Sequence, residues 1–427
     1  MPSETKSPDV LTCPIEHVNT FDPEFLQDPY PFYERMRREA PVYRDPNSGI
    51  VSISTDEYIR EANLQPKIFS NDFSSLLRSG SANTTSDEEL EIMSEGVPVV
   101  DTMLTADPPT HTRYRKLAMK AFTYKRVLGM EDYIIRTSEL LLDSFIDAGE
   151  CDFKSAFSNM LPMYVIVDSL GAPRKDFDKF KRWSDAMVGQ LGGMATPEER
   201  IHNARAIIEF QKYFIEKIEQ KREAPTEDVI SDLVHADLSE EGDNRKMEHS
   251  ELLSIIQQIL VAGNESTANS IAAGLYYILT HPDQHQAILV DPSLIPNFCE
   301  ETLRFLSPSN NMWRAVKEDV TIGGVDIKAG EAVLLRYGSG NRDAARYENG
   351  EHFNIKRQNA KEHLAFGHGI HTCIGAQLAR IEMKTAYKVI FERLKNIRLS
   401  DKQKGLRYTP NILLRGPTEL YIEFDKA

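Results

Sequence analysis

The chain has 427 residues and a net charge of −15 at pH 7. This negative balance argues against a nucleic-acid-binding protein, because such proteins need a basic surface. No run of about 18 apolar residues occurs, so the sequence predicts no membrane span. The four cysteines lack the spacing of a disulfide framework, which favours a reducing compartment such as the cytoplasm.

The domain organisation is simple. We find no linker and no internal repeat, so we expect a polar N-terminal extension over residues 1–21 and a single domain over 22–427. The extension lacks the basic and then apolar layout of a secretion signal. In chain order, the patterns predict a helix over 28–40, a hairpin over 41–54, an almost unbroken series of helices over 110–306, a β-rich patch over 313–337, a helix over 376–394 and an extended tail over 408–424. The fold class is therefore mainly α with small β-sheets.

The longest predicted helix runs from about residue 250 to the His281-Pro282 pair. Thirty residues at 1.5 Å each span roughly 45 Å, enough to cross the whole molecule. Its middle holds Ala262, Gly263, Asn264, Glu265, Ser266 and Thr267 in succession. A glycine and small hydroxyl residues weaken a helix at this point, because a hydroxyl can bond the carbonyl one turn back. Read by itself, the segment is a polar stripe on a long helix.

The most informative segment is the loop that precedes the last helix. Residues 366–375 read Phe-Gly-His-Gly-Ile-His-Thr-Cys-Ile-Gly, with Cys373 among three glycines. Glycines let a flat ligand lie close to the backbone, and the start of the following helix aims N–H groups at the sulfur, which favours thiolate. A thiolate held by such a loop suits the axial position of a haem iron.

Other interpretations of this loop remain open at this point. A lone cysteine is often a small buried apolar residue. A zinc site could use His363, His368, His371 and Cys373, although their spacing matches no common zinc pattern. A phosphate-binding glycine loop is weakly supported, because the lysine and Ser/Thr that complete it are absent.

The segment from Phe366 to Arg380, FGHGIHTCIGAQLAR, resembles the cysteine-ligand signature of the cytochromes P-450, the haem-thiolate monooxygenases. The resemblance extends from about residue 22 to 424, with the motifs in the family's order. It implies the cytochrome P-450 fold, a triangular prism of helices around a long central helix. It also implies haem b (iron protoporphyrin IX) as cofactor and Cys373 as the axial ligand of its iron.

The resemblance assigns roles to further residues. The central-helix segment resembles the family's oxygen-activating segment, with Glu265 and Ser266 as the acid and alcohol that relay protons on the distal side of the haem. The family most often has threonine where Ser266 stands, so coupling could be looser, and Thr267 is a second candidate. The remaining cofactor-binding residues implied are Phe366, Gly367 and Gly375 in the loop, Ala262 and Gly263 in the central helix, and His111, Arg115, Arg314 and His371 as partners of the haem propionates. Glu301, Arg304 and Arg357 resemble the family's buried structural trio.

Electrons are expected to come from outside the chain, because no reductase domain fits in it. The resemblance implies NAD(P)H as the source, through a separate ferredoxin or flavodoxin and its reductase. Between residues 108 and 130 there are six Lys or Arg and no acid. We therefore expect Arg113, Lys116 and Lys120 to form a docking face for an acidic partner.

The family's pocket positions in this chain are mostly apolar, which favours a small hydrophobic substrate such as a terpenoid, a steroid or an alkyl-aromatic compound. The pocket residues expected are Leu76, Leu77, Val99, Val100, Met103, Met187, Leu191, Ile259, Met312, Ile412 and Leu413. Asn310 and Asn311 are expected to bind a polar group of the substrate. The protein is expected to be a monomeric cytoplasmic enzyme. Two other classes stay open: a haem-thiolate sensing protein without oxygenation, and the zinc protein. A hydrolase has little support, because Gly338-Ser339-Gly340 lacks the nucleophile elbow.

Overall fold

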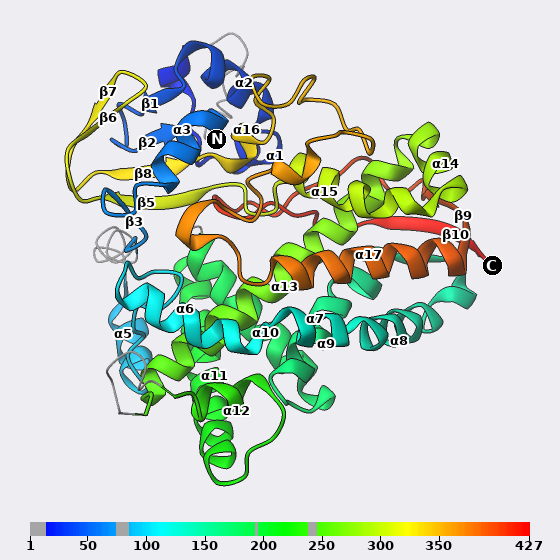
Figure 1. Ribbon diagram of the computed structural model, residues 1–427, viewed down its shortest axis with the longest axis horizontal. Coiled ribbons are helices and arrows are strands. Elements are labelled where there is room, and N and C mark those ends of the chain that lie inside the picture. The colour runs from blue at the N-terminus through cyan, green and yellow to red at the C-terminus, as the bar shows by residue number, and fades with distance from the viewer. Residues whose placement is uncertain (1–13, 74–84, 193–194, 238–245) are drawn as a thin grey trace, which may run out of the picture.

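The long helix α13, His249–Leu279, runs through the middle of the computed structural model, which describes residues 14–73, 85–192, 195–237 and 246–427 (Figure 1). It begins at a capping box, in which Glu248 N donates to Glu251 Oε2 at 2.8 Å. It ends just before Pro282, which opens the next helix. The predicted central helix is thus confirmed, and it packs against α9, α10, α11, α14, α15 and α17.

Helices form most of the remaining structure, as the periodicity predicts. Their bounds are α1 Pro23–Gln27, α2 Tyr30–Glu39, α3 Asp56–Asn63, α5 Asp87–Ser94, α6 Thr110–Ala121, α7 Tyr124–Gly129, α8 Glu131–Asp143, α9 Met160–Ser169, α10 Phe177–Gly192, α11 Pro197–Glu223, α12 Val229–Val234, α14 Pro282–Val290, α15 Ile295–Leu306, α16 Tyr337–Gly340 and α17 Ala376–Arg393. A short π-helical segment, Lys154–Ser158, precedes α9 and packs against α13.

Strands gather in three small sheets. Their bounds are β1 Val42–Arg44, β2 Val51–Ile53, β3 Phe69–Ser70, β4 Glu150–Asp152, β5 Met312–Val316, β6 Val320–Ile322, β7 Val325–Ile327, β8 Ala332–Leu335, β9 Leu394–Leu399 and β10 Tyr421–Lys426. The five-stranded sheet has the order β1-β2-β8-β5-β3, and only the β2–β8 pair is parallel within it. The predicted turn between β6 and β7 is confirmed, with Gly323 and Gly324 at φ 57° and 78°.

The expected extended tail over residues 408–424 contains one strand and two bridges. Residues 421–426 form β10, which lies between β4 and β9. Upstream of it, isolated bridges join Tyr408 to Pro417 and Ser309 to Leu414.

Apolar side chains fill the space on both sides of α13. One cluster joins its C-terminal half to α8, α15, α17 and the β9–β10 sheet. A second joins its N-terminal half to α9, α10, α11 and α12. Ile15 and Val18 are buried in a third cluster with Trp313, so the polar extension expected over 1–21 is packed on the fold from Ile15 onward, and residues 1–13 lie outside the described part. No helix among the described residues is both long enough and apolar enough to cross a membrane.

Candidate active site around Cys373

The loop that carries Cys373 is held by backbone geometry that glycine permits. Gly367 and Gly369 have φ angles of 71° and 75°, a region that side chains disfavour. A Cβ atom at Gly369 would lie 2.6 Å from the carbonyl oxygen of Asn63. Cys373 N donates to Phe366 O at 2.8 Å, which closes the loop. The loop therefore presents its sulfur at the start of α17, as the sequence predicts.

The protonation of Cys373 depends on opposing effects. Burial raises the pKa of the thiol, whereas hydrogen bonds from the backbone of Gly375 and Ala376 and the charges of Arg115 and Arg380 lower it. The sum is a raised pKa for the free thiol, although the helix start lowers it as the sequence predicts. A coordinated cation deprotonates a thiol outright. The residues around Cys373 thus fit a metal-ligating sulfur.

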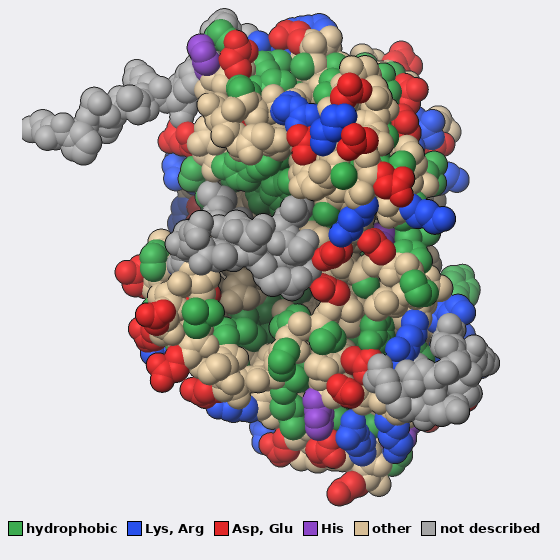
Figure 2. Space-filling view, turned by 90° about the vertical axis from the view of Figure 1, so that its left-hand side faces the viewer, with side chains coloured by type: hydrophobic (Ala, Val, Ile, Leu, Met, Phe, Trp, Pro, Cys, Tyr) green, Lys and Arg blue, Asp and Glu red, His purple; other side chains and the backbone are tan. Residues whose placement is uncertain are grey.

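Cys373 is exposed, although burial by the surrounding protein raises its pKa. Ala262 is also exposed, although it lies in the middle of α13. Exposure in the middle of a packed helix means that solvent-accessible space reaches that point, and we call this space the hollow. Figure 2 shows one face of the molecule that is hollowed and has hydrophobic side chains around the hollow.

Four nitrogen-bearing side chains near this loop lack an anionic partner. The rings of His111 and His371 lie 4.2 Å apart. Both nitrogens of His111 and Nε2 of His371 are buried without a hydrogen-bond partner in the described structure. Burial and the charges of His111, Arg314 and Arg115 lower the pKa of His371 to about 3. Buried donors and cations without counter-charge fit the carboxylates of a haem propionate.

The two arginines of this group are anchored by neutral oxygens. Arg314 donates to Asn63 Oδ1 at 2.6 Å and to the carbonyl oxygen of Trp313 at 2.7 Å. Arg115 donates to the carbonyl oxygen of Thr372, next to the cysteine. The structure thus brings together all four residues that the sequence proposed as propionate partners.

The predicted acid and alcohol, Glu265 and Ser266, are adjacent residues of α13 and have different surroundings. Ser266 Oγ donates to Ala262 O at 3.2 Å, the bond to the preceding turn that the sequence predicts. Glu265 Oε1 accepts from Asn269 Nδ2 at 3.1 Å. Thr267 is 4% exposed, which leaves Ser266 as the more accessible hydroxyl.

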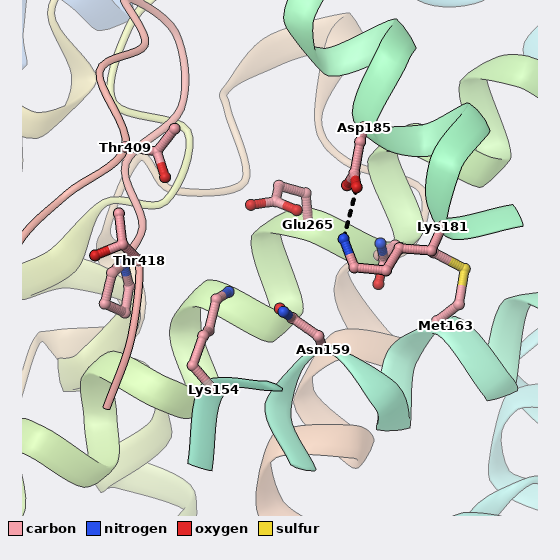
Figure 3. A pocket seen from close by; sticks show the side chains of 10 residues that line it. Lys154, Asn159, Met163, Lys181, Asp185, Glu265, Thr409 and Thr418 are labelled. Carbon is pink, nitrogen blue, oxygen red and sulfur yellow. Dashed lines mark hydrogen bonds and ion pairs between the residues drawn. The ribbon is translucent and has the colours of Figure 1, made fainter. Parts of the chain in front are cut away.

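Glu265 lines a polar cavity of about 250 Å³ (Figure 3). Its other walls include Lys154, Lys181 and Asp185, and Lys181 forms an ion pair of 2.6 Å with Asp185. Sequence reasoning missed Lys154 and Asn269. Asn269 stands four residues after Glu265, on the same helix face, so that spacing was the available signal.

Gly263 lies elsewhere than the sequence suggested. A Cβ atom at Gly263 would lie 2.5 Å from Ile166 Cδ1. The glycine therefore permits close packing of α13 on α9, and the structure gives it that role on this side of the helix. Ala262, one residue earlier, is the residue that borders the hollow.

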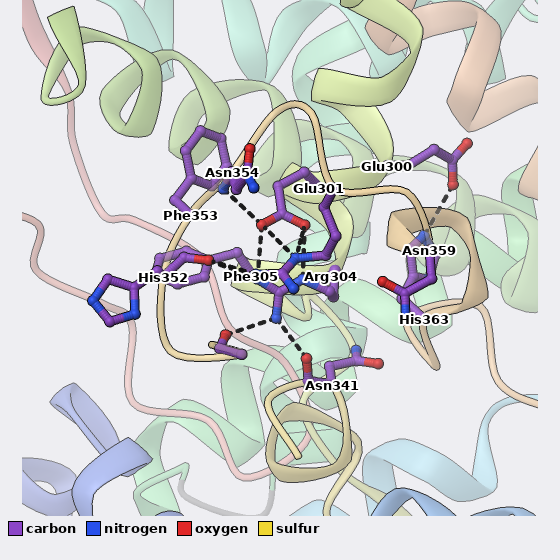
Figure 4. A network of polar contacts seen from close by, with 12 residues as sticks. Glu300, Glu301, Arg304, Phe305, Asn341, His352, Phe353, Asn354, Asn359 and His363 are labelled. Carbon is purple, nitrogen blue, oxygen red and sulfur yellow. Dashed lines mark hydrogen bonds and ion pairs between the residues drawn. The ribbon is translucent and has the colours of Figure 1, made fainter. Parts of the chain in front are cut away.

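The structural trio is brought together as the sequence proposed (Figure 4). The Glu301 carboxylate accepts from Arg304 Nε and Nη2, each at 2.7 Å, and from Arg357 Nε at 3.2 Å. The two guanidinium groups also bind main-chain carbonyl oxygens, and those of Asn341, Glu348, Asn349, Gly350 and His352 accept from them. Glu301 and Arg304 are fully buried. The trio therefore fixes the loop that precedes the cysteine segment.

The proposed docking face is less uniform than the sequence suggested. Lys116 and Lys120 on α6 are exposed, whereas Arg113 is only partly exposed. Its guanidinium lies 5.4 Å from the ring centre of Tyr114. The position of Arg113 around the helix predicted that it shares the exposed face of the two lysines. In the structure, the ring of Tyr114 lies beside its guanidinium, and Arg113 is less exposed than the lysines.

Two further expectations are overturned by contacts. Asn310 and Asn311 are buried, and both accept from the hydroxyl group of Tyr33, at 3.2 and 3.3 Å, so they stabilise the packing of α2 rather than face a substrate. The zinc interpretation fails because His363 bonds Glu300 at 3.1 Å and His368 lies 3.3 Å from Arg60. The described residues contain no group of three or more His, Cys, Asp or Glu that could hold a metal ion.

The expected substrate pocket is only partly in view. Met187, Ile259, Ile412 and Leu413 are buried in core clusters, whereas Val99 is 53% exposed. Leu76 and Leu77 lie outside the described residues, as does the side chain of Leu191.

Comparisons with known proteins agree with this site. The family model described as "Cytochrome P450" matches residues 94–291 and 292–424. Cytochrome P450 107B1 of Saccharopolyspora erythraea is 36% identical over 415 residues, which cover 96% of this chain and 98% of that protein. Cytochrome P450 monooxygenase PikC of Streptomyces venezuelae is 33% identical over 97% of this chain and 95% of its own length. The structure of CYP109E1 from Bacillus megaterium in complex with corticosterone is 32% identical, covers 94% of this chain and 99% of that one, and has a TM-score of 0.80.

Proposed function

Because the chain belongs to the cytochrome P450 family and is a cytochrome P450 monooxygenase, we propose that it oxidises a small hydrophobic compound with haem b held by Cys373. The observation that carries this proposal is the position of Cys373. Its sulfur receives backbone N–H groups at the start of α17 and borders the hollow opposite Ala262. When bound, haem supplies the activation of dioxygen and the insertion of one oxygen atom into a C–H or C=C bond.

The chain's own residues hold the cofactor. Cys373 Sγ ligates the iron, with the N–H groups of Gly375 and Ala376 fixing the direction of the sulfur. His111, Arg115, Arg314 and His371 bind the two carboxylates of the cofactor, which satisfies the unpartnered ring nitrogens. Phe366, Gly367, Gly375 and Ala262 border its two faces.

Glu265 and Ser266 supply protons. Glu265 takes a proton at its carboxylate from the polar cavity, and Ser266 Oγ carries it toward the hollow after releasing its bond to Ala262 O. The two residues stand next to each other on α13 but contact different spaces, so they can connect solvent to the reaction side.

The substrate class rests on chemistry and on one neighbour. The family's pocket positions in this chain are mostly apolar, and CYP109E1 was solved with corticosterone. We therefore favour a steroid, a terpenoid or an alkyl-aromatic compound. Electrons come from NAD(P)H through a ferredoxin or flavodoxin that meets the exposed lysines Lys116 and Lys120, and the protein acts as a cytoplasmic monomer.

The first experiment measures the absorption spectrum of the reduced protein under carbon monoxide. We expect the strongly red-shifted band of a haem-thiolate protein. Cys373→Ala removes that band, whereas Cys151→Ala, which changes a thiol in β4, keeps it. A Cys373→Ala protein with the band and with monooxygenase turnover would overturn the proposal.

A second experiment tests the proton relay. Glu265→Gln and Ser266→Ala should divert electrons to peroxide without changing substrate binding. Ser270→Ala is the matched control, because Ser270 Oγ also bonds the carbonyl one turn back, at 2.8 Å, but is fully buried. Equal yields of product per NAD(P)H in all three variants would contradict the relay.

The docking face is tested by charge reversal at low salt. Lys116→Glu and Lys120→Glu should slow electron transfer from an acidic ferredoxin, and added salt should reduce the difference. Lys404→Glu reverses an exposed lysine outside this segment and serves as control. An unchanged rate in the α6 variants removes the docking face from the proposal.

A further inference from the structure

A buried lysine stands behind the central helix. Lys154 is 5% exposed, and its neighbours Phe153 and Phe157 are fully buried. A lysine in such surroundings is costly unless its ammonium group is hydrogen-bonded and paired with a negative charge. Lys154 begins the π-helical segment that packs against α13, so its ammonium group meets the helix that carries Glu265.

A single amide connects the ammonium group to Glu265. Lys154 Nζ donates to Asn269 Oδ1 at 2.6 Å, and Asn269 Nδ2 donates to Glu265 Oε1 at 3.1 Å. Lysine only donates, so the amide oxygen must face it, and the amide NH₂ then faces Glu265. An NH₂ group needs an acceptor, and Glu265 Oε1 supplies it. One amide therefore links the ammonium group of Lys154 to the carboxylate of Glu265.

The amide itself has little freedom to turn. A Cβ atom at Gly416 would lie 1.9 Å from Asn269 Cγ and 2.1 Å from both its terminal atoms. The amide thus lies flat against the backbone of Gly416. Because this space is filled, Asn269 transmits the position of Lys154 to the carboxylate.

The charges around Lys154 come from three elements. Burial lowers the pKa of Lys154, and the charge of Lys181 lowers it further. The charge of Glu265 on α13 raises the pKa most, and those of Asp152 and Asp185 raise it less. Lys181 and Asp185, both on α10, are exposed and paired with each other. Glu265 is therefore the main counter-charge of the buried ammonium group.

We propose that Lys154 is a positioning residue for Glu265, whose carboxylate it holds in a fixed direction at the polar cavity through the amide of Asn269. The inference rests on the proposed proton-relay function of Glu265 and adds the group that positions it. Figure 3 shows Lys154 and Glu265 at the wall of the same cavity. Without the ammonium group, the amide loses its bonding partner and the carboxylate loses its fixed direction, so fewer protons pass from the cavity to Ser266.

The test replaces Lys154 with methionine, which keeps the length of the side chain and removes the charge. In the haem-loaded protein we expect an unchanged carbon-monoxide spectrum and unchanged substrate titration. Product formed per NAD(P)H falls about 10-fold, the size typical of coupled neighbouring residues. Lys154→Arg, which keeps the charge and the hydrogen-bond donor, restores the wild-type product yield.

The matched control is Lys221→Met. Lys221 is also largely covered and pairs with one carboxylate, Asp228, at 2.6 Å, but on α11. Its loss should leave product yield unchanged. The double variant Lys154→Met with Glu265→Gln should behave as Glu265→Gln alone, because Lys154 acts through that carboxylate.

The outcomes separate this inference from the proposed function. If Glu265→Gln is impaired while Lys154→Met keeps the wild-type yield, Lys154 has only a structural role and the inference is wrong. If Glu265→Gln itself keeps wild-type coupling, the relay fails first. If Lys154→Met does not fold, Lys154→Leu replaces it, since leucine fills the buried site without a donor for Asn269. A wild-type product yield in that variant overturns the inference.

Discussion

The buried carboxylate of Glu301 offers a sharp test of what holds the core together. Glu301→Gln keeps the volume of the side chain but removes its charge. The new amide NH₂ must face either Arg304 or Arg357, and both guanidiniums only donate. The remaining amide oxygen accepts from the other arginine, so one of the two buried cations keeps only main-chain carbonyl oxygens as partners. Breaking a buried ion pair in this way costs about 3–5 kcal/mol.

The size of this loss can be compared with the same substitution on the surface. Glu39 also meets two arginines, Arg35 at 3.1 Å and Arg38 at 2.7 Å, but it is exposed. Solvent screens that cluster, so Glu39→Gln should leave stability unchanged. A loss of about 3–5 kcal/mol is a large share of the roughly 5–15 kcal/mol that stabilises a typical protein.

The assay is urea unfolding of both variants, followed by circular dichroism and by release of haem. We expect a clearly lower midpoint for Glu301→Gln, together with earlier loss of haem, because the trio fixes the loop before Cys373. The midpoint of Glu39→Gln should match the wild type. Equal midpoints in the two variants would refute the reasoning that burial decides the worth of these ion pairs.

Three further predictions concern packing and pH. Gly274→Ala places a Cβ atom 2.1 Å from Tyr387 Oη, so urea unfolding should show a free energy of unfolding lower by about 1–3 kcal/mol. Gly129→Ala, whose Cβ atom meets no atom within 4 Å, should leave stability unchanged. Equal stability of the two variants would contradict the clash. Burial raises the pKa of Glu300, but hydrogen bonds from His363 and Arg380 lower it to about 2 from 4.5. The stabilising effect of this carboxylate is therefore present above pH 4.5 and is lost as pH falls toward 2. Glu300→Gln should make the urea midpoint less dependent on pH over this range, and an unchanged pH dependence would exclude Glu300 as its cause. Burial lowers the pKa of Lys154, so the folded state binds fewer protons than the unfolded state and stability rises with pH up to about 10.5. Lys154→Met should remove that rise, which urea unfolding at several pH values measures. A rise that persists in the variant would mean that other groups cause it.

The sequence was sufficient for features that depend on local pattern. The break at Pro282 and the glycine turn at Gly323 and Gly324 are short-range signals, and the structure has both of them. The loop around Cys373 was also recognisable, because its glycines and cysteine are specified at fixed spacing within ten residues.

The features that were missed depend on tertiary contacts. Asn310 and Asn311 looked available to a ligand, but the hydroxyl group of Tyr33, nearly three hundred residues earlier, occupies them. Lys154 was passed over because only the packing of its segment on α13 brings it to Asn269. The burial that raises the pKa of Cys373 also depends on tertiary contacts, whereas the helix start that lowers it is visible in the sequence.

The trio around Glu301 also bears on how freely the chain can change during evolution. Arg304 and Arg357 donate hydrogen bonds to main-chain carbonyl oxygens of the loop over residues 341–352, and every amino acid has such an oxygen. The identity of the exposed side chains at residues 344–346 and 348 is therefore free to drift while the path of the loop is preserved. Gly350 is fixed, because a Cβ atom there would lie 2.4 Å from the carbonyl oxygen of Arg342, and Asn341, Arg342, Asp343 and Tyr347 are buried. A library randomised over the exposed positions should accordingly recover many sequences that keep the same loop path.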